Sequence, residues 1–144
     1  MDICILEKSE LAIALDLVWE VFQAYEEPDY SEQGVREFRS AISDPEFIEE
    51  LTMYGAYESG QLAGVLATRS SGTHIALFFV KGAYHRQGIG RALFKRAATD
   101  MSGATMTVNS SPYAAPVYRK LGFRELGQEQ VVNGMRFIPM LFEA

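Results

Sequence analysis

The stretch HIALFFVKGAYHRQGIGRALFKRAATDM, residues 74–101, decides the fold. Residues 74–80 are almost entirely apolar, which is typical of a central strand that is covered on both faces. A loop over residues 81–90 follows, and residues 91–101 favour a helix. The stretch is therefore a strand–loop–helix unit with two glycines where the helix begins.

The glycine pair, Gly88 and Gly90, is open to two interpretations. The first N–H groups of a helix lack partners and carry the positive end of its dipole, so glycines there let amides approach a phosphate closely. Arg86 and Arg91 add positive charge to such a site. A tight turn explains the pair equally well. The GxGxxG motif is excluded because its third glycine position holds Leu93, and no Gly-Lys-Ser/Thr of a P-loop is present.

Working outward to the N-terminal side, residues 2–7 predict a first strand and Ser9 the N-cap of a helix. A second, shorter helix is expected from Ser31 to a point before Asp44-Pro45. One face of each helix is apolar, lined in the first by Leu11, Leu15, Val18, Phe22 and Tyr25, and in the second by Val35, Phe38 and Ile42. Both helices should therefore pack inward.

A hairpin is predicted between the second helix and the central strand. Its strands are residues 53–59 and 61–70, joined at Ser59-Gly60. On the far side of the central unit, residues 105–108 predict another strand.

The C-terminal part adds a helix and two strands. Ser111 is the expected N-cap with Pro112 at the first helical position, and the helix runs from Ala114 to Leu121 before Gly122 ends it. The last strands, 123–132 and 135–143, are joined by Asn133-Gly134, a strong hairpin signal. The order is strand, two helices, three strands, helix, strand, helix and two strands.

Composition limits the function classes. The chain has 144 residues, 48% of them hydrophobic, and no linker or repeat, which predicts one domain over residues 1–144. Cys4 is the only cysteine, so no disulfide framework forms, and no clustered His or Cys suggests a bound metal. A net charge of −6 disfavours nucleic-acid binding. We expect a cytoplasmic protein, because the sequence has neither a signal peptide nor a membrane-spanning apolar run.

Two segments together resemble the GCN5-related N-acetyltransferase (GNAT) superfamily. FFVKGAYHRQGIGRAL, residues 78–93, resembles its acetyl-CoA motif Q/R-x-x-G-x-G/A, and APVYRKLGF, residues 115–123, resembles its tyrosine-bearing helix. The resemblance covers nearly the whole chain. It implies an α/β (α+β) fold with a mixed, mostly antiparallel central sheet of about 6–7 strands flanked by about 4 helices.

The resemblance also implies a binding site for coenzyme A. The backbone amides of one segment would wrap its pyrophosphate: Arg86, Gln87, Gly88, Ile89, Gly90 and Arg91. The backbone of Phe78, Phe79 and Val80 would pair with the pantetheine arm as with an added strand. His85 departs from the usual Gln or Arg of the motif, which leaves its side-chain contact open, whereas the amide cradle does not depend on that side chain.

The implied general acid is Tyr118, whose phenol is protonated at neutral pH and can protonate the departing sulfur. The alternative is a packing role on a short helix. Counting back from Val80 places His74 where some relatives carry a basic glutamate, with water as the alternative base. Either Asn109 or Ser111 is expected to contact the cofactor, although the same residues also suit helix capping.

The predicted function is an acetyl-CoA-dependent N-acetyltransferase that acts directly on a primary amine of a small molecule or a peptide. The alternative is a non-catalytic acyl-CoA-binding or regulatory module. Residues 25–33 and the hairpin 127–137 should surround the acceptor. The first contains acidic residues that either receive a cationic amine or belong to a solvated loop: Glu26, Glu27, Asp29 and Glu32. The terminal hairpin also offers edges for a possible homodimer.

Overall fold

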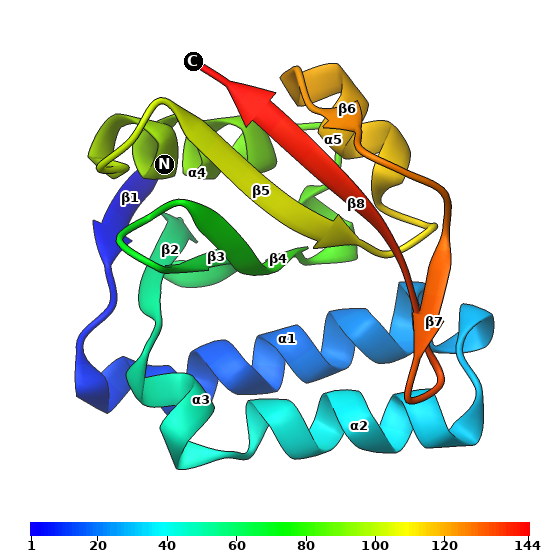
Figure 1. Cartoon of the computed structure of the whole chain (residues 1–144). Coiled ribbons are helices and arrows are strands. Elements are labelled where there is room, and N and C mark those ends of the chain that lie inside the picture. Colours follow the sequence, from blue (N-terminus) through cyan, green and yellow to red (C-terminus); the bar gives the residue numbers. More distant parts are fainter.

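The computed structural model describes residues 1–144 and contains one eight-stranded sheet with five α-helices (Figure 1). The strands are β1 (Asp2–Ile5), β2 (Thr52–Glu58), β3 (Gln61–Arg69), β4 (His74–Val80), β5 (Thr105–Ser110), β6 (Arg124–Glu125), β7 (Gln130–Val132) and β8 (Met135–Glu143). The helices are α1 (Leu11–Tyr25), α2 (Glu32–Ile42), α3 (Pro45–Glu49), α4 (Ile89–Asp100) and α5 (Ala115–Leu121). Three 3₁₀ turns are η1 (Lys8–Glu10), η2 (Glu27–Asp29) and η3 (Gly82–Tyr84).

The sheet is mixed and mostly antiparallel, as the sequence predicts. Its strand order is β1-β2-β3-β4-β5-β8-β6, with β7 paired to β8, and only β4 and β5 run parallel. The expected count of about 6–7 strands is slightly low. The predicted strand 123–132 is divided into β6 and β7, with Gly127 in the segment between them.

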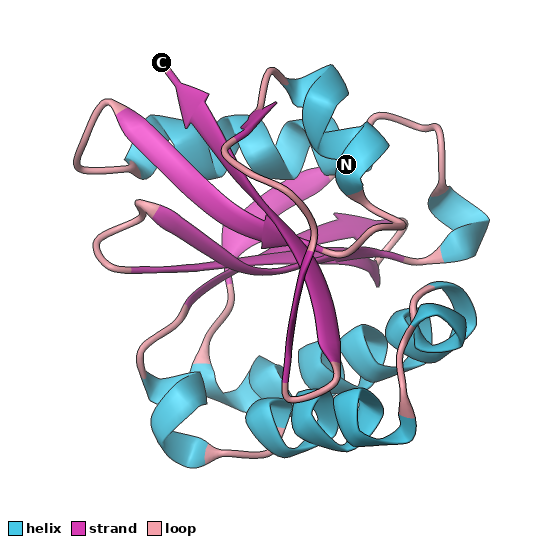
Figure 2. Cartoon of the chain, turned by 45° about the vertical axis from the view of Figure 1, so that its right-hand side comes forward, coloured by secondary structure: helices cyan, strands magenta, loops and turns pink.

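Helices cover both faces of the sheet. Figures 1 and 2 show α1 and α2 on one face and α4 and α5 on the other. The core on the first side includes Val18 and Phe22 of α1, and the core on the second includes Leu93 of α4 and Tyr118 of α5. The sheet therefore separates two layers of packed side chains.

The strands β4 and β5 pair only at one end. The register joins His74 to Thr107 and Ile75 to Val108, and no pairing with β5 continues along the rest of β4. The edge of β4 that faces β5 is therefore open toward its carboxyl end, where the loop to α4 begins.

The pairing of β4 with β3 shows which backbone groups of β4 point toward β5. The Lys81 N–H donates to the Ala63 carbonyl at 2.9 Å, and hydrogen-bonded positions alternate along an antiparallel pair. The backbone of Phe79 consequently faces β3, whereas the N–H and C=O groups of Phe78 and Val80 point toward β5. These groups have no partner in a neighbouring strand at the open end, and of them the Val80 carbonyl is bonded to the His85 side chain.

Several helix ends differ from the prediction. Ser9 is not an N-cap: it lies in η1, where the Glu7 N–H donates to the Glu10 carboxylate at 3.0 Å, and α1 follows directly. The sequence also missed α3, in which Asp44 accepts from the Glu46 N–H at 3.0 Å and a proline begins the helix. Ser31 is the N-cap of α2 as predicted, accepting from the Gly34 N–H at 3.2 Å.

The start of α5 also lies later than predicted. Ser111 caps the preceding turn by accepting from the Ala114 N–H at 3.1 Å, and Pro116, rather than Pro112, stands in the first turn of the helix. Gly122 ends the helix with a φ of 107°. None of the helices combines the length and the apolar character that a membrane-spanning helix requires.

Candidate functional site

A cavity of about 430 Å³ lies at the open end of β4. It is bounded by that strand, the loop into α4, the segment 113–121 that contains α5, and the end of α1. Its lining includes Val21, Glu26, Phe78, Phe79, Val80, Tyr84, His85, Arg86, Gly88, Ile89, Gly90, Arg91, Tyr113, Ala114, Val117, Tyr118, Lys120 and Leu121. The two segments that the sequence singles out thus meet at one site.

The loop into α4 presents backbone amides to this cavity. Gly88 is the residue before the helix, with a φ of 82° and no side-chain cap, and the first backbone bond of the helix is from the Ala92 N–H to the Gly88 carbonyl at 3.0 Å. The N–H groups of residues 89–91 therefore have no partner within the helix. Arg86, with a φ of 63°, and Arg91 also line the cavity. Free amides beside two cations suit a pyrophosphate.

Both glycines leave room for such a ligand. A Cβ added at Gly88 would meet no atom within 4 Å, and one added at Gly90 would lie 3.4 Å from Cζ of Phe78. Gly88 therefore borders open space where it lines the cavity, and a side chain at Gly90 would lie against the Phe78 ring. This geometry fits a phosphate group that approaches the backbone closely.

Two of the other loop residues have structural roles in the chain. The Gln87 side chain donates to the Ala83 carbonyl at 3.2 Å and does not line the cavity. Ile89 is buried and packs in the core beneath α4.

His85 contacts the open edge of β4. Its Nε2 atom lies 2.7 Å from the Val80 carbonyl oxygen, and because a carbonyl only accepts, Nε2 carries the hydrogen of this bond. The ring also packs against Tyr25 of α1, with centroids 5.0 Å apart. The motif position that departs from Gln or Arg is therefore tied to the strand edge, next to the expected pantetheine path.

Tyr118 is held rigidly beside the same strand. Its ring is 5% exposed and packs edge-on against Phe78 and Phe123, with centroids 5.7 and 5.3 Å away. Burial raises the pKa of the phenol, and the negative charge of Glu26 raises this pKa further. The hydroxyl group is consequently protonated at neutral pH and can act as a hydrogen-bond donor.

Two predicted residues do not reach the cavity. His74 lies at the closed end of β4, where its Nδ1 is 2.7 Å from Oγ1 of Thr107, and burial lowers the pKa of its imidazole. Asn109 is exposed near the C-terminal end of β5, opposite Pro139 of β8. Neither side chain lines the cavity.

Glu26 lines the cavity, and it is one of the acidic residues for which the sequence leaves open a cationic amine or a solvated loop. It is the residue after α1 and is only 8% exposed. Burial raises the pKa of its carboxyl group to about 7, with a smaller contribution from the charge of Asp29, while the nearby Ser111 hydroxyl lowers this pKa. The sequence contains a pattern that indicates this burial. Ala14, Val18 and Phe22 form a buried row at spacings of four along α1, and Glu26 continues the row.

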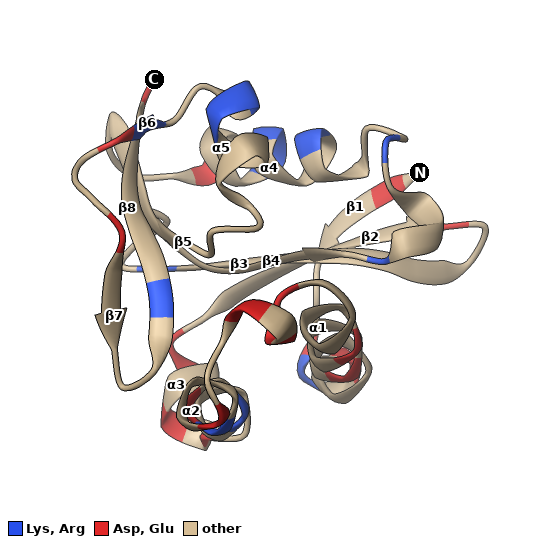
Figure 3. Ribbon diagram, turned by 90° about the vertical axis from the view of Figure 1, so that its right-hand side faces the viewer, with Lys and Arg blue, Asp and Glu red and all other residues tan.

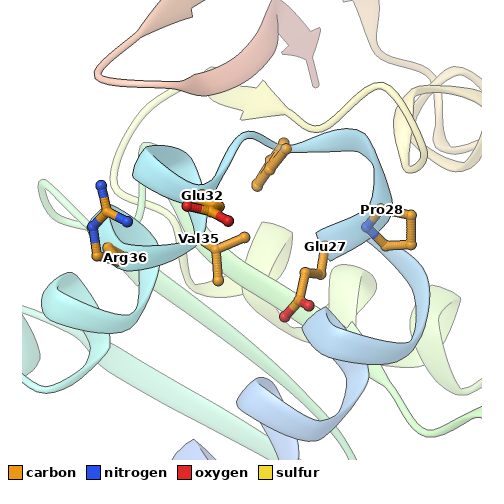
Figure 4. Close-up of a pocket in the computed structure, with 6 residues that line it drawn as sticks. Glu27, Pro28, Glu32, Val35 and Arg36 are labelled. Carbon is orange, nitrogen blue, oxygen red and sulfur yellow. The ribbon is translucent and has the colours of Figure 1, made fainter.

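The remaining acidic residues of this loop lie elsewhere. Glu27 and Glu32 line a separate hollow of about 470 Å³ between η2 and α2, together with Pro28, Tyr30, Val35 and Arg36 (Figure 4). The predicted acidic cluster is therefore divided, and among its members Glu26 faces the main cavity.

Charge is distributed unequally over the two faces of the sheet. Figure 3 shows Lys and Arg on α4 and α5 and acidic segments on α1 and on the loop between α1 and α2, while α2 carries both signs of charge. Lys120 of α5 lines the cavity together with Arg86 and Arg91 of the segment that leads into α4. A phosphate-bearing ligand is thus favoured from one side and a cation from the other.

The terminal hairpin fastens the loop between α1 and α2. Arg136 of β8 donates to the Asp29 carbonyl at 3.1 Å and forms an ion pair with Glu129 at 2.8 Å. Gly34 at the start of α2 lies so close to Gly134 that an added Cβ would meet its carbonyl oxygen. The two segments expected around an acceptor therefore contact each other.

Comparison with known families identifies a match over most of the chain. A family model described as "Acetyltransferase (GNAT) domain" matches residues 26–144. No curated protein sequence matches this chain.

Solved structures with the same fold cover almost the entire chain. A GCN5-related N-acetyltransferase from Rhodopseudomonas palustris is 21% identical, with a TM-score of 0.81 over 99% of this chain and 95% of that one. The PaiA N-acetyltransferase from Thermoplasma acidophilum, solved with coenzyme A, is 17% identical, with a TM-score of 0.71 over 99% and 98%.

The ribosomal-protein-S18-alanine N-acetyltransferase from Escherichia coli is a third similar structure. It is 22% identical, with a TM-score of 0.65 over 99% of this chain and 92% of that one. At these identities the similarity establishes the fold alone. The acceptors named for these proteins are not assigned to this chain.

Proposed function

The chain belongs to the family of the acetyltransferase (GNAT) domain, and we propose that it transfers the acetyl group of acetyl-CoA directly to a primary amine of a small molecule or a peptide. The observation that carries this proposal is the cavity that Tyr118 shares with the phosphate loop and the open edge of β4. In this proposal the residues that bind acetyl-CoA lie next to Tyr118, which donates a proton to the departing thiolate.

The binding of acetyl-CoA uses complementary parts of this site. The amides of residues 89–91, with Arg86 and Arg91, receive the pyrophosphate. The pantetheine arm follows the free edge of β4, where the N–H and C=O of Phe78 and the N–H of Val80 have no strand partner. The Val80 carbonyl already accepts from His85. We assign no backbone contact to Phe79, because its N–H and C=O groups face β3.

Tyr118 assists the departure of the thiolate. When the nitrogen has attacked the carbonyl carbon, the C–S bond breaks with its electron pair on sulfur, and the phenol donates its hydrogen to that sulfur. Packing against Phe78 and Phe123 restrains the ring, so the hydroxyl is preorganised beside the open strand edge.

Direct transfer is the preferred route because a covalent acetyl-enzyme would require a nucleophile. Cys4, the only thiol, lies in β1 at an edge of the sheet and does not line the cavity. The amine therefore attacks the thioester itself in this proposal.

The first test compares ligands by thermal unfolding, with acetyl-CoA against ATP and NAD. We expect acetyl-CoA to raise the unfolding temperature and the other two nucleotides to have little effect, because they lack the pantetheine arm that pairs with β4. Release of the free thiol in the presence of amines then separates a transferase from a module that only binds acyl-CoA. If acetyl-CoA left the unfolding temperature unchanged, both the transferase and the acyl-CoA-binding module would be ruled out.

A further inference from the structure

Glu26 is a buried carboxylate without a cationic partner. The ion pairs of the structure involve other residues, and no Lys, Arg or His lies within 4 Å of its carboxylate. Buried charges in proteins are normally paired, because an isolated charge loses its hydration without compensation. The chain therefore supplies no positive charge within 4 Å to stabilise the ionised Glu26 carboxylate.

The groups that face Glu26 are polar or acidic. Ser111 faces it from the loop before α5 and Asp29 from η2. Its charge also acts on Tyr30, Tyr113 and Tyr118, in each case raising the pKa of the phenol. The basic side chains that line the same cavity are His85, Arg86, Arg91 and Lys120, and its tyrosines are Tyr84, Tyr113 and Tyr118. Arg136, the nearest cation of the hairpin, is held by Glu129 and by a backbone carbonyl.

We propose that Glu26 receives the acceptor amine as an alkylammonium ion and removes its proton before the nitrogen attacks the thioester. This inference rests on the proposed function and adds to it a general base and a substrate class, amines that are cationic at neutral pH. Its basis is geometric: the carboxylate comes from the α1 side of the cavity, and Tyr118 comes from the α5 side.

The proton and electron balance is complete with these two residues. The ammonium gives one proton to the Glu26 carboxylate, and the nitrogen lone pair forms the N–C bond. The C–S bond then breaks with its electron pair on sulfur. The nitrogen loses its second proton as the amide forms. One proton reaches the sulfur through Tyr118 and the other leaves through Glu26 to solvent, which gives the N-acetyl amine and the thiol of coenzyme A.

The charge of Glu26 also links the two steps. While it is ionised it raises the pKa of Tyr118, so the phenol is a weak acid before the amine has been deprotonated. Once Glu26 has taken the proton its charge disappears, and this contribution to the Tyr118 pKa disappears with it. The acid therefore becomes stronger at the stage at which the leaving group requires it.

The test measures kcat/KM for acetyl transfer to n-butylamine and putrescine as a function of pH, in the wild type, Glu26→Gln and Glu20→Gln. Glu20 is an exposed acidic residue of the same helix outside the cavity, so its variant controls for the loss of one negative charge. Acetyl-CoA affinity, measured by titration calorimetry, should be unchanged in both variants.

For the wild type we expect kcat/KM to rise as the pH passes about 7, where Glu26 ionises, and then to level off. Glu26→Gln should lose about 100-fold or more near neutral pH, and its rate should keep rising toward the pKa of the free amine, about 10. Only the neutral amine present in solution can react with that variant. Glu20→Gln should follow the wild-type curve.

Wild-type values and an unchanged pH profile in Glu26→Gln would overturn the assignment of the base while leaving the acetyltransferase intact. If the wild type bound acetyl-CoA but acetylated no amine, the proposed function itself would be wrong. Should Glu26→Gln fail to fold, Glu26→Asp serves instead. It retains the carboxyl group one methylene farther from the amine, and we expect a lower kcat with the limb of the pH profile preserved.

Discussion

Glu26 and Tyr118 line one cavity from opposite faces of the sheet, and the charge of the first raises the pKa of the second. Their environments differ because the carboxylate ends the buried row of α1, whereas the phenol is enclosed between aromatic rings. Two titratable groups with separated pKa values at one cavity are the arrangement that acid–base catalysis requires.

The stability of the protein should report the burial of Glu26 without any assay of activity. The carboxyl pKa is 4.5 in its ordinary state and about 7 in the folded protein. Below pH 4.5 the group is neutral in both states, between these values only the folded state keeps the proton, and above 7 the full cost of the buried charge is present. Glu26→Gln should therefore be more stable than the wild type by about 3 kcal/mol at pH 8, and nearly equally stable at pH 4.

Chemical denaturation at the two pH values measures this difference. Glu20→Gln provides the control for an exposed carboxylate of the same helix, and it should shift the free energy of unfolding by less than about 0.5 kcal/mol at either pH. A Glu26→Gln variant that is less stable than the wild type at pH 8 would mean that the carboxylate has a favourable partner.

The phosphate loop can be tested with a matched pair of glycines. Gly88 and Gly60 have φ angles of 82° and 79°, and an added Cβ meets no atom within 4 Å at either position. Alanine should cost each site about 1–2 kcal/mol of stability through the left-handed backbone. Only Gly88→Ala should also weaken acetyl-CoA binding, by about tenfold or more, because Gly88 lines the cavity and Gly60 does not.

Titration calorimetry of both alanine variants with acetyl-CoA distinguishes the two effects. Equal affinity in Gly88→Ala and Gly60→Ala would show that the loop does not approach the pyrophosphate.

Tyr118→Phe should separate chemistry from binding. Phenylalanine keeps the packing against Phe78 and Phe123 and removes only the hydroxyl. We expect kcat to fall by about 100-fold, with little change in the dissociation constant of acetyl-CoA or in the unfolding temperature. Stopped-flow measurement of thiol release gives kcat, and turnover at the wild-type rate would exclude Tyr118 as the acid.

The contact between α2 and the terminal hairpin should affect the acceptor more than the donor. A Cβ at Gly34 would collide with the carbonyl group of Gly134 and displace the hairpin, whereas one at Gly103 would lie 3.7 Å from Thr73 in ordinary contact. Gly34→Ala should therefore raise the KM for the amine and leave the acetyl-CoA affinity nearly unchanged. Gly103→Ala is the control, and an equal effect of both variants would refute an acceptor role for this contact.

Much of the fold is local and could be predicted from the sequence. The apolar strand 74–80, the glycines before α4 and the hairpin at Asn133-Gly134 have strong local signals, and the structure has the expected elements there. The first residues of the helices are harder to predict from the sequence, because capping depends on backbone geometry. The side chain of Ser9 is not used as an N-cap, whereas the side chain of Asp44 is.

The site required information that only the tertiary structure contains. Counting along β4 predicts His74 at the site, but this strand pairs with β5 at the His74 end and opens at the other. Glu26 stands among acidic neighbours in the sequence, and its burial depends on how α1 lies against the sheet. Its position in the row of Ala14, Val18 and Phe22 is visible in the sequence, yet the facing tyrosines come from distant segments.

The most direct measurement follows the acetyl group itself. The protein is incubated with acetyl-CoA carrying a ¹³C-labelled carbonyl and with a panel of primary alkylamines and short peptides with free amino termini, and the products are recorded by NMR and mass spectrometry. We expect enzyme-dependent formation of an N-acetyl amine together with one equivalent of free coenzyme A. Binding of acetyl-CoA without transfer of the label to any nitrogen would contradict the account.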